Sequence, residues 1–164
     1  MSDHLERILN TIMQISMKCS IAVHCLIFIH EAKGIAKVTS NLLSESTGCN
    51  PVVIRNILSA LKKAGLITVP RGTGGAQLCA DPSQITLYQI YTALEPKGVT
   101  SLIGIHPCEG RQCPVAQNIR KVLERPYHKI KDAVKEAMEQ TTLASMIEEF
   151  HGLTGRQNGG GPVS

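Results

Sequence analysis

The segment between residues 39 and 79 constrains the fold of this chain more than any other part of the sequence. Thr39 can cap a short helix, because its hydroxyl can accept a hydrogen bond from a backbone N–H of the first turn. The run Thr47-Gly48-Cys49-Asn50 then ends that helix, since Gly48 can adopt a positive φ angle. Pro51 suits the first position of a second helix, where its missing N–H costs no hydrogen bond. Two helices joined by a short glycine-containing turn form a helix-turn-helix.

The second helix of this unit has one apolar side and one polar side. Apolar residues recur at helical spacing and are expected to form its buried face: Val53, Ile54, Ile57, Leu58 and Leu61. The outer face then carries Val52, Arg55, Asn56 and Ser59. In a helix-turn-helix, the second helix enters the major groove of DNA with its N-terminal residues facing the base edges. The pattern therefore predicts a DNA-recognition helix.

A β-hairpin is expected directly after this helix. Gly65 ends the helix, and the β-prone run 66–69 can pair with 76–79 across the glycine-rich turn 71–75. Arg71 is the one cation in that turn, and the neighbouring glycines leave its guanidinium room to enter a narrow minor groove. The alternative is an ordinary helix–hairpin unit with a solvated arginine. The order of helix, turn, helix and arginine-tipped hairpin favours a winged helix-turn-helix that binds DNA.

The rest of the chain is expected to be mainly α-helical, with the hairpin as a small β wing. Leu87–Leu94 is predicted as a short helix capped by Thr86, and Pro114 and Pro126 are each predicted to start a helix, the second being the longest. The predicted division is 1–16 as a short helix or extension, 17–95 as the winged DNA-binding domain, 96–113 as a cysteine-bearing loop, 114–150 as dimerisation helices and 151–164 as a flexible tail.

The helix after Pro126 carries an apolar stripe that needs a partner. The stripe consists of Ile130, Val134, Ala137 and Met138. A homodimer provides that partner and places two recognition helices about one DNA turn apart on a near-palindromic site. The alternative is that the helix folds back on its own domain.

Residues 38–94 resemble the Rrf2 family of winged-helix regulators. The matching pieces are VTSNLLSESTGCN, LKKAGLI, RGTGGAQL and DPSQITLYQIYTALE. The resemblance implies a homodimer on operator DNA, paired by a long C-terminal helix and controlled by a cysteine-bearing loop. It places Asn50, Val52, Arg55 and Asn56 at base edges and Arg71 on the wing; Arg55 stands where iron–sulfur members carry a glutamate. Together with Thr39, Pro51, Lys62 and Lys63, these are the residues expected at the DNA.

The loop before Pro114 is the candidate sensor. His106, Cys108 and Cys113 precede a helix N-terminus, whose positive end favours a thiolate. Thiolates favour zinc or an iron–sulfur cluster, but iron–sulfur members of the family carry three cysteines spaced by five residues and this loop has two. Three interpretations stay open: a cluster or metal, reversible thiol oxidation, or no sensory role. Cys19, Cys25 and Cys79 are expected to be packing residues, and Cys49 a turn residue.

Composition narrows the functional class. A net charge of +4 and a pI near 8.8 suit a polyanionic partner. Two Phe, three Tyr and no Trp argue against binding of single strands by base stacking. No apolar run is long enough for a membrane span, no signal peptide is recognisable and no catalytic constellation is found, so a cytoplasmic, non-enzymatic protein is expected. The leading prediction is a dimeric transcription regulator that acts as a repressor. Two alternatives stay open: a thiol or metal redox protein, and an adaptor that docks on an enzyme.

Overall fold

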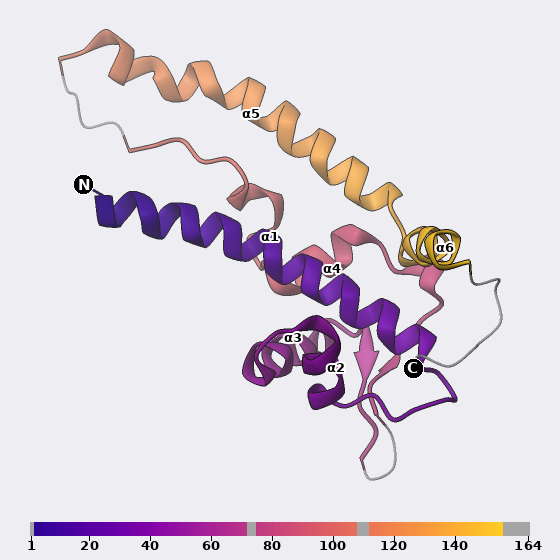
Figure 1. The fold of residues 1–164 in the computed structure, drawn as a ribbon. Coiled ribbons are helices and arrows are strands. Elements are labelled where there is room, and N and C mark those ends of the chain that lie inside the picture. The colour runs from indigo at the N-terminus through magenta and orange to yellow at the C-terminus, as the bar shows by residue number, and fades with distance from the viewer. Residues whose placement is uncertain (1, 72–74, 108–111, 156–164) are drawn as a thin grey trace.

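The computed structural model is mostly helical, with a small two-stranded sheet (Figure 1). It describes the backbone of residues 2–71, 75–107 and 112–155, and the side chains of these ranges from residue 17 onward. The elements in chain order are α1 (Ser2–Glu31), α2 (Ser40–Thr47), α3 (Pro51–Lys63), β1 (Ile67–Thr68), β2 (Gln77–Leu78), the 3-10 turn η1 (Pro82–Gln84), α4 (Leu87–Leu94), the 3-10 turn η2 (Gly98–Ser101), α5 (Pro114–Gln140) and α6 (Leu143–Thr154). None of the described helices is both long and apolar enough to cross a membrane.

Helix α1 is continuous from Ser2 to Glu31. Residues 1–16 were expected to form a short helix or extension before the winged domain, but α1 runs through this boundary without a break. Its sequence between these bounds contains neither glycine nor proline, so nothing interrupts the backbone hydrogen bonds. Ala22, Cys25 and Leu26 are fully buried, and Cys25 is thus a packing residue as predicted.

The hydrophobic core gathers five helices of the same chain. Each contributes a fully buried side chain: Leu26 from α1, Leu43 from α2, Ile54 from α3, Ile90 from α4 and Leu143 from α6. The contribution from α6 shows that part of the predicted dimerisation region, residues 114–150, also packs into the core of its own chain. Leu143 is removed from water inside its own chain, where burial of a leucine side chain stabilises by about 1.5–3 kcal/mol.

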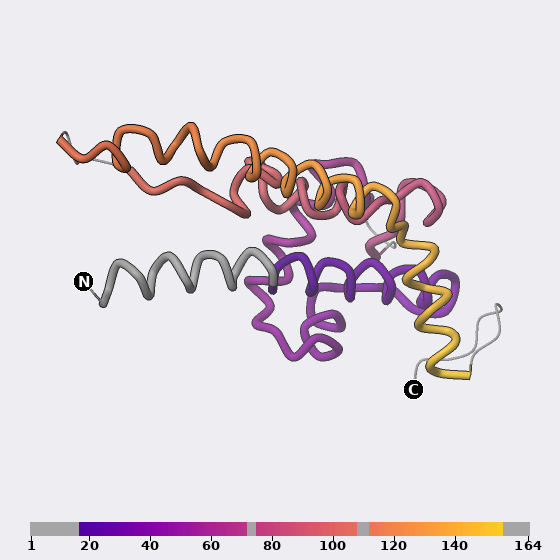
Figure 2. Tube along the Cα trace, turned by 90° about the horizontal axis from the view of Figure 1, so that it is seen from above, coloured from indigo at the N-terminus to yellow at the C-terminus, as the bar shows by residue number. Residues whose placement is uncertain are grey.

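The start of α4 is tied to the junction between α5 and α6. The N–H of Leu87 donates to the carbonyl of Thr141 over 2.8 Å, and the N–H of Leu143 donates to the carbonyl of Ile85 over 2.7 Å. Thr86 caps α4 as predicted: its hydroxyl accepts from the N–H of Gln89, and its own N–H donates to Gln89 Oε1. Figure 2 shows α6 crossing from the end of α5 to the C-terminal part of α1. The long helix is thus anchored to the winged domain at its C-terminal end.

Helix α5 is one helix of 27 residues, not two. The expected break at Pro126 is absent, although the proline lies inside the helix. A proline removes one backbone hydrogen bond and crowds the carbonyl four residues before it, whereas the turns on both sides keep theirs. The packing of α5 against α4 and η2 adds to its stability. In Figure 1, α5 lies on the side of the molecule opposite α2, α3 and the wing.

The two segments that flank these C-terminal helices are more ordered than the sequence analysis expected. In the predicted loop, Gly98 and Val99 are buried in η2, where Gly98 has a φ of +55°. The predicted tail from residue 151 begins inside α6, which continues to Thr154 and ends at Gly155 in the left-handed conformation. Residues 156–164 lie outside the described part of the chain.

Candidate DNA-binding interface

The turn between α2 and α3 is built by short side chains that hydrogen-bond to the local backbone. The Thr39 hydroxyl accepts from the N–H of Leu42 over 3.2 Å and starts α2, as predicted. Gly48 follows α2 with a φ of +68°. The Asn50 carboxamide oxygen then accepts from the N–H of Val52 over 2.8 Å and starts α3. These caps fix the direction in which α3 leaves the domain.

Helix α3 separates its side chains as a recognition helix does. Ile54, Ile57 and Leu61 are buried in the core. The predicted outer face is exposed: Val52, Arg55, Asn56 and Ser59. Val53 was expected in the buried face but is 36% exposed, because the core-facing side of α3 is narrower than its apolar pattern. The first two turns of α3 therefore present two valines, an arginine and an asparagine to solvent.

Exposed cations occur at the end of α3 and after β1. Lys62 and Lys63 are exposed in the last turn of α3. Arg71 is exposed after β1, which pairs in antiparallel register with β2 through Ile67 opposite Leu78. The hairpin lies on the same side of the molecule as α2 and α3 (Figure 1). The predicted order of helix, turn, helix and hairpin is present; Gly72 and Gly74 lie outside the described residues.

A close backbone approach at Gly75 positions the base of the wing. A Cβ atom at this residue would lie 2.3 Å from the backbone nitrogen of Val38 and 2.6 Å from its oxygen. The next residue, Ala76, donates its N–H to the Val38 carbonyl over 2.9 Å. Only glycine allows the strand to lie this close to the segment before α2. The sequence pattern indicated only a turn at Gly75, because this contact joins residues far apart in the chain.

The structure describes only part of the candidate sensor loop. His106 and Cys113 are exposed, and Cys113 occupies the N-cap of α5 without a hydrogen bond from its side chain to the helix. Cys108, with the residues up to 111, lies outside the described part. Within the described residues no three metal-ligating side chains gather. Metal or cluster binding by His106, Cys108 and Cys113 therefore stays a prediction.

The other cysteines divide into buried and exposed thiols. Burial raises the pKa of the half-buried Cys19. Burial, followed by the neighbouring Cys49, raises the pKa of Cys25 to about 12. Both belong to the core or pack against it, as expected for small apolar residues. Cys79, which was expected to pack, is exposed beyond β2. Cys49 is half-buried, and its thiol lies 3.7 Å from the Thr47 carbonyl oxygen.

The apolar stripe of α5 is divided between two environments. Val134 and Met138 are half-buried, on a helix that packs against α4 and η2. Ile130 is 45% exposed, and Ala137 is also exposed. Val115 and Val122 extend the exposed part toward the N-terminal end of α5, at 68% and 63% exposure. No side chain of α5 is buried in the single chain, so much of its apolar surface is uncovered.

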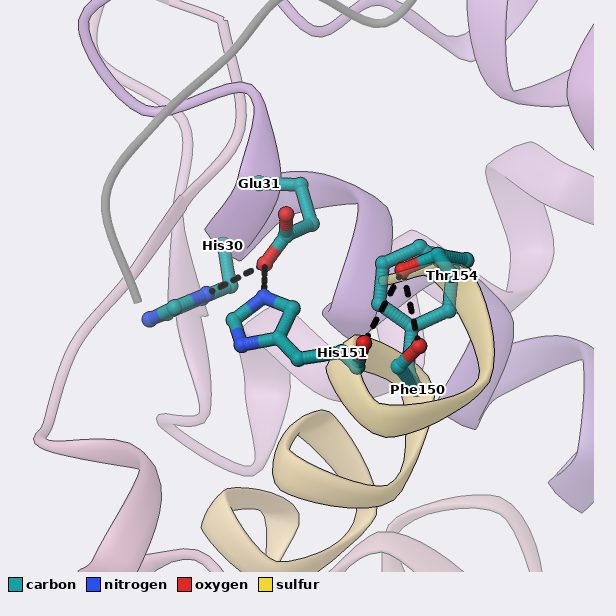
Figure 3. Close-up of polar contacts among 5 residues, drawn as sticks. All are labelled: His30, Glu31, Phe150, His151 and Thr154. Atoms are coloured by element: carbon teal, nitrogen blue, oxygen red, sulfur yellow. Dashed lines mark hydrogen bonds and ion pairs between the residues drawn. The ribbon is translucent and has the colours of Figure 1, made fainter. Parts of the chain in front are cut away.

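A polar contact that the sequence analysis missed joins α1 to α6 (Figure 3). Glu31 Oε1 accepts hydrogen bonds from Nε2 of His151 over 2.8 Å and from Nδ1 of His30 over 3.2 Å. The side chains of Glu31 and His151 are only 12% and 11% exposed. Burial raises the pKa of Glu31, but the hydrogen bonds from His151 and His30 lower it by more, so it lies below its ordinary value.

Comparisons with known proteins agree with this architecture. A family model, Rrf2, described as an iron-dependent transcriptional regulator, matches residues 15–149. The chain is 29% identical over 136 residues to YwnA of Bacillus subtilis, named as a candidate HTH-type transcriptional regulator, with 83% of this chain and 98% of YwnA covered. A candidate transcriptional regulator from Lactobacillus plantarum superimposes with a TM-score of 0.68 at 30% identity, covering 82% of this chain and 90% of that one. T. potens IscR shares the fold, with a TM-score of 0.63 at 23% identity over 86% of this chain and 90% of its own. The chain belongs to the Rrf2 family of transcriptional regulators.

Proposed function

We propose that this regulator reads operator DNA with α3 in the major groove and the wing against the minor groove. One observation carries the proposal: the first two turns of α3 carry exposed side chains, and α3 lies on the same side of the molecule as the wing (Figure 1). Arg55 and Asn56 can pair with guanine and adenine edges, respectively, and Val52 can contact a thymine methyl group. The Arg71 guanidinium suits a narrow minor groove.

The remaining surface residues position the protein on the duplex. Lys62 and Lys63 suit phosphate contacts, which strengthen binding to all sequences and depend on salt. Thr39 and Pro51 start the two helices, where backbone N–H groups can face phosphates. The carboxamide oxygen of Asn50 already accepts from the Val52 N–H. Its contribution to DNA therefore comes from the carboxamide N–H groups.

The uncovered face of α5 supports a homodimer. Val115, Val122 and Ile130 are separated by seven and eight residues, close to two helical turns each, so they share one face. Ala137 continues this face toward the anchored end of the helix. Association with the same face of a second copy removes these side chains from water, at about 25 cal/mol per Å² of apolar surface. The two-fold axis then relates two recognition helices.

The sensor loop leads into this pairing helix. His106 and Cys113 flank Cys108 in the segment between η2 and the first turn of α5. Thiol and imidazole groups suit zinc or iron–sulfur ligation, and the description of the family model as iron-dependent favours iron. Anaerobic purification followed by an absorption spectrum and metal analysis tests this assignment. A cluster gives visible absorption and iron, whereas a colourless, metal-free protein supports thiol oxidation or no sensory role.

Selection of binding sites from random double-stranded DNA tests the proposed function as a whole. We expect enriched sites to be near-palindromic, with half-sites about one helical turn apart. The affinity for an enriched site should fall steeply as the salt concentration rises, because phosphate contacts release counterions. Failure to enrich any site over successive rounds, with protein shown to be folded, would contradict the proposal.

A further inference from the structure

A pocket of about 440 Å³ opens between α1, α2 and α6. Its volume lies within the range of about 300–1,000 Å³ that is usual for small-molecule sites. Val23 and Ile27 from α1 form part of its apolar wall. The chain contains only two phenylalanines, and both of them, Phe28 and Phe150, line this pocket. We refer to it as the Phe28–Phe150 pocket.

One acidic side chain, Glu31, lines the Phe28–Phe150 pocket, and none of its lining residues is lysine or arginine. Figure 3 shows Glu31 between His30 and His151, close to the end of α6 that carries Phe150. The hydrogen bonds from the histidines outweigh the effect of burial and hold the pKa of Glu31 below its ordinary value, so the carboxylate is ionised at neutral pH. The pocket therefore combines apolar walls, aromatic rings and a carboxylate that two histidines hold in place.

The polar groups of the pocket determine how a cation could be held. Glu31 Oε1 already accepts from two imidazole groups. A primary ammonium group binds best where acceptor oxygens can take its N–H groups. A quaternary ammonium group has no N–H to place and is attracted by the negative charge and by aromatic faces alone. The Ser20 and Ser46 hydroxyls also line the pocket and can accept hydrogen bonds from an ammonium group. The charge, the rings and the hydroxyls together match an organic cation.

We infer that the Phe28–Phe150 pocket binds a small organic cation with an apolar body. The inference does not depend on any residue placed at the DNA. The pocket nevertheless touches the DNA-reading unit, because Ser46 of α2 lines it. Ser46 Oγ lies 3.0 Å from His24 Nε2 of α1 and joins the two helices. A bound cation therefore contacts the first helix of the helix-turn-helix and the C-terminal helix together.

Binding of phenyltrimethylammonium and of its uncharged isostere tert-butylbenzene to the full-length protein tests the inference. Two-dimensional NMR titration reports both affinity and location. We expect phenyltrimethylammonium to bind about tenfold more tightly than tert-butylbenzene, because only the cation gains from the carboxylate and the ring faces. The shifted signals should include those of Phe28, Phe150 and Ser46.

Three variants separate the contributions of the carboxylate and of the aromatic ring to cation binding. Glu31→Gln keeps a hydrogen-bond acceptor for His151. It should lower the affinity for the cation about tenfold and leave the affinity for the isostere unchanged. Glu148→Gln removes the same charge from an exposed position of α6 outside the pocket and should leave both affinities unchanged. Phe150→Leu retains the apolar wall without the ring and should lower the affinity for the cation more than the affinity for the isostere. A thermal melt checks that this variant is folded.

Several results would overturn the inference. Equal affinities for the cation and its isostere would show that charge does not contribute to binding. Equal losses of cation affinity in the Glu31→Gln and Glu148→Gln variants would show that the cation does not bind in this pocket. Sedimentation showing that Phe150→Leu abolishes self-association, with no cation bound by the wild type, would identify the pocket as a contact between copies. DNA binding is measured in parallel, so that a failed operator assay leaves the result for the pocket intact.

Discussion

His151 Nε2 lies 2.8 Å from Glu31 Oε1, although 120 positions separate the two residues in sequence. This hydrogen bond joins the C-terminal end of α1 to α6, and α6 in turn follows the long helix α5. Because Leu143 of α6 is also buried in the core, the last described helix is fastened to the winged domain at both its ends. The predicted pairing helix is therefore held by rigid contacts on its C-terminal side.

We expect His151→Ala to lower the free energy of unfolding by about 1–2 kcal/mol, because it removes a partly buried hydrogen bond to a charged group. Urea denaturation at pH 7 measures this change. Glu148→Ala, at an exposed position of the same helix, is the control and should change the free energy by less than about 0.5 kcal/mol. An equal loss in both variants would mean that the contact contributes no specific stability.

The same contact predicts a dependence of stability on pH. The pKa of Glu31 in the folded chain is lower than its ordinary value of 4.5. Its stabilising contribution is therefore complete above pH 4.5 and is lost as the pH falls through the folded pKa. Urea denaturation between pH 7 and pH 3 should show a smaller acid loss for Glu31→Gln than for the wild type. Parallel curves for the two proteins would contradict this assignment.

The local parts of the DNA-binding unit could be predicted from the sequence because nearby residues determine them. The Thr39 cap, the Gly48 turn and the Pro51 start act within one or two turns, and the structure has each of them where expected. The approach of Gly75 to Val38 could not be predicted in this way. It depends on how the hairpin folds onto a distant segment, and a glycine in a glycine-rich turn carries no sign of such a contact.

The C-terminal half was harder to predict for the same physical reason. Pro126 signals a helix start locally, yet the helix continues through it. The apolar residues of α5 and α6 look alike in sequence, but Leu143 is buried in its own chain and Val122 is 63% exposed. Tertiary packing, which the periodic pattern does not encode, decides between these environments. The Glu31–His151 contact had no local signal in the sequence at all.

The position of the wing should depend on Gly75. A methyl group at this residue would meet the backbone of Val38 at 2.3 Å, and backbone atoms cannot move aside cheaply. Gly75→Ala should therefore shift the hairpin and weaken binding to a selected operator at least about tenfold, equivalent to about 1.4 kcal/mol. Gly104→Ala is the matched control, since nothing lies within 4 Å of an added Cβ there. Equal operator affinities in the two variants would show that the wing does not need this approach.

Base reading and phosphate binding should separate on mutation of α3. Arg55→Ala should relax the preference at one major-groove base pair by about 1–3 kcal/mol. Lys62→Ala should lower the affinity for all DNA sequences alike and reduce the slope of affinity against salt concentration. Fluorescence anisotropy on a set of singly substituted operators measures both effects. If Arg55→Ala lowers the affinity for every sequence equally, Arg55 contacts the backbone and does not read a base.

Dimer formation should depend on the exposed face of α5. Deleting the chain from residue 126 is an unsuitable test, because it also removes Leu143 from the core. Val122→Glu places a charge at a side chain that is 63% exposed and should convert a dimer into a folded monomer. His128→Glu adds a charge to another exposed face of the same helix and is the control. Analytical ultracentrifugation showing a dimer in both variants would contradict pairing through this face.

The sensor loop should control the geometry of the dimer. Cys113 is the N-cap of α5, so ligation or disulfide formation by Cys108 and Cys113 would constrain the segment that leads into the predicted pairing helix. A shift of a few ångströms between two recognition helices is enough to disturb their match to half-sites one turn apart, and a difference of only about 1–3 kcal/mol between states is required. Cys108→Ser and Cys113→Ser should therefore retain operator binding but lose its response to hydrogen peroxide or to iron supply.

Cys79→Ser, which removes an exposed thiol elsewhere, should keep the full response. If both loop variants respond like the wild type, the signal enters at another site, and the half-buried Cys49 before the recognition helix is the next residue to substitute.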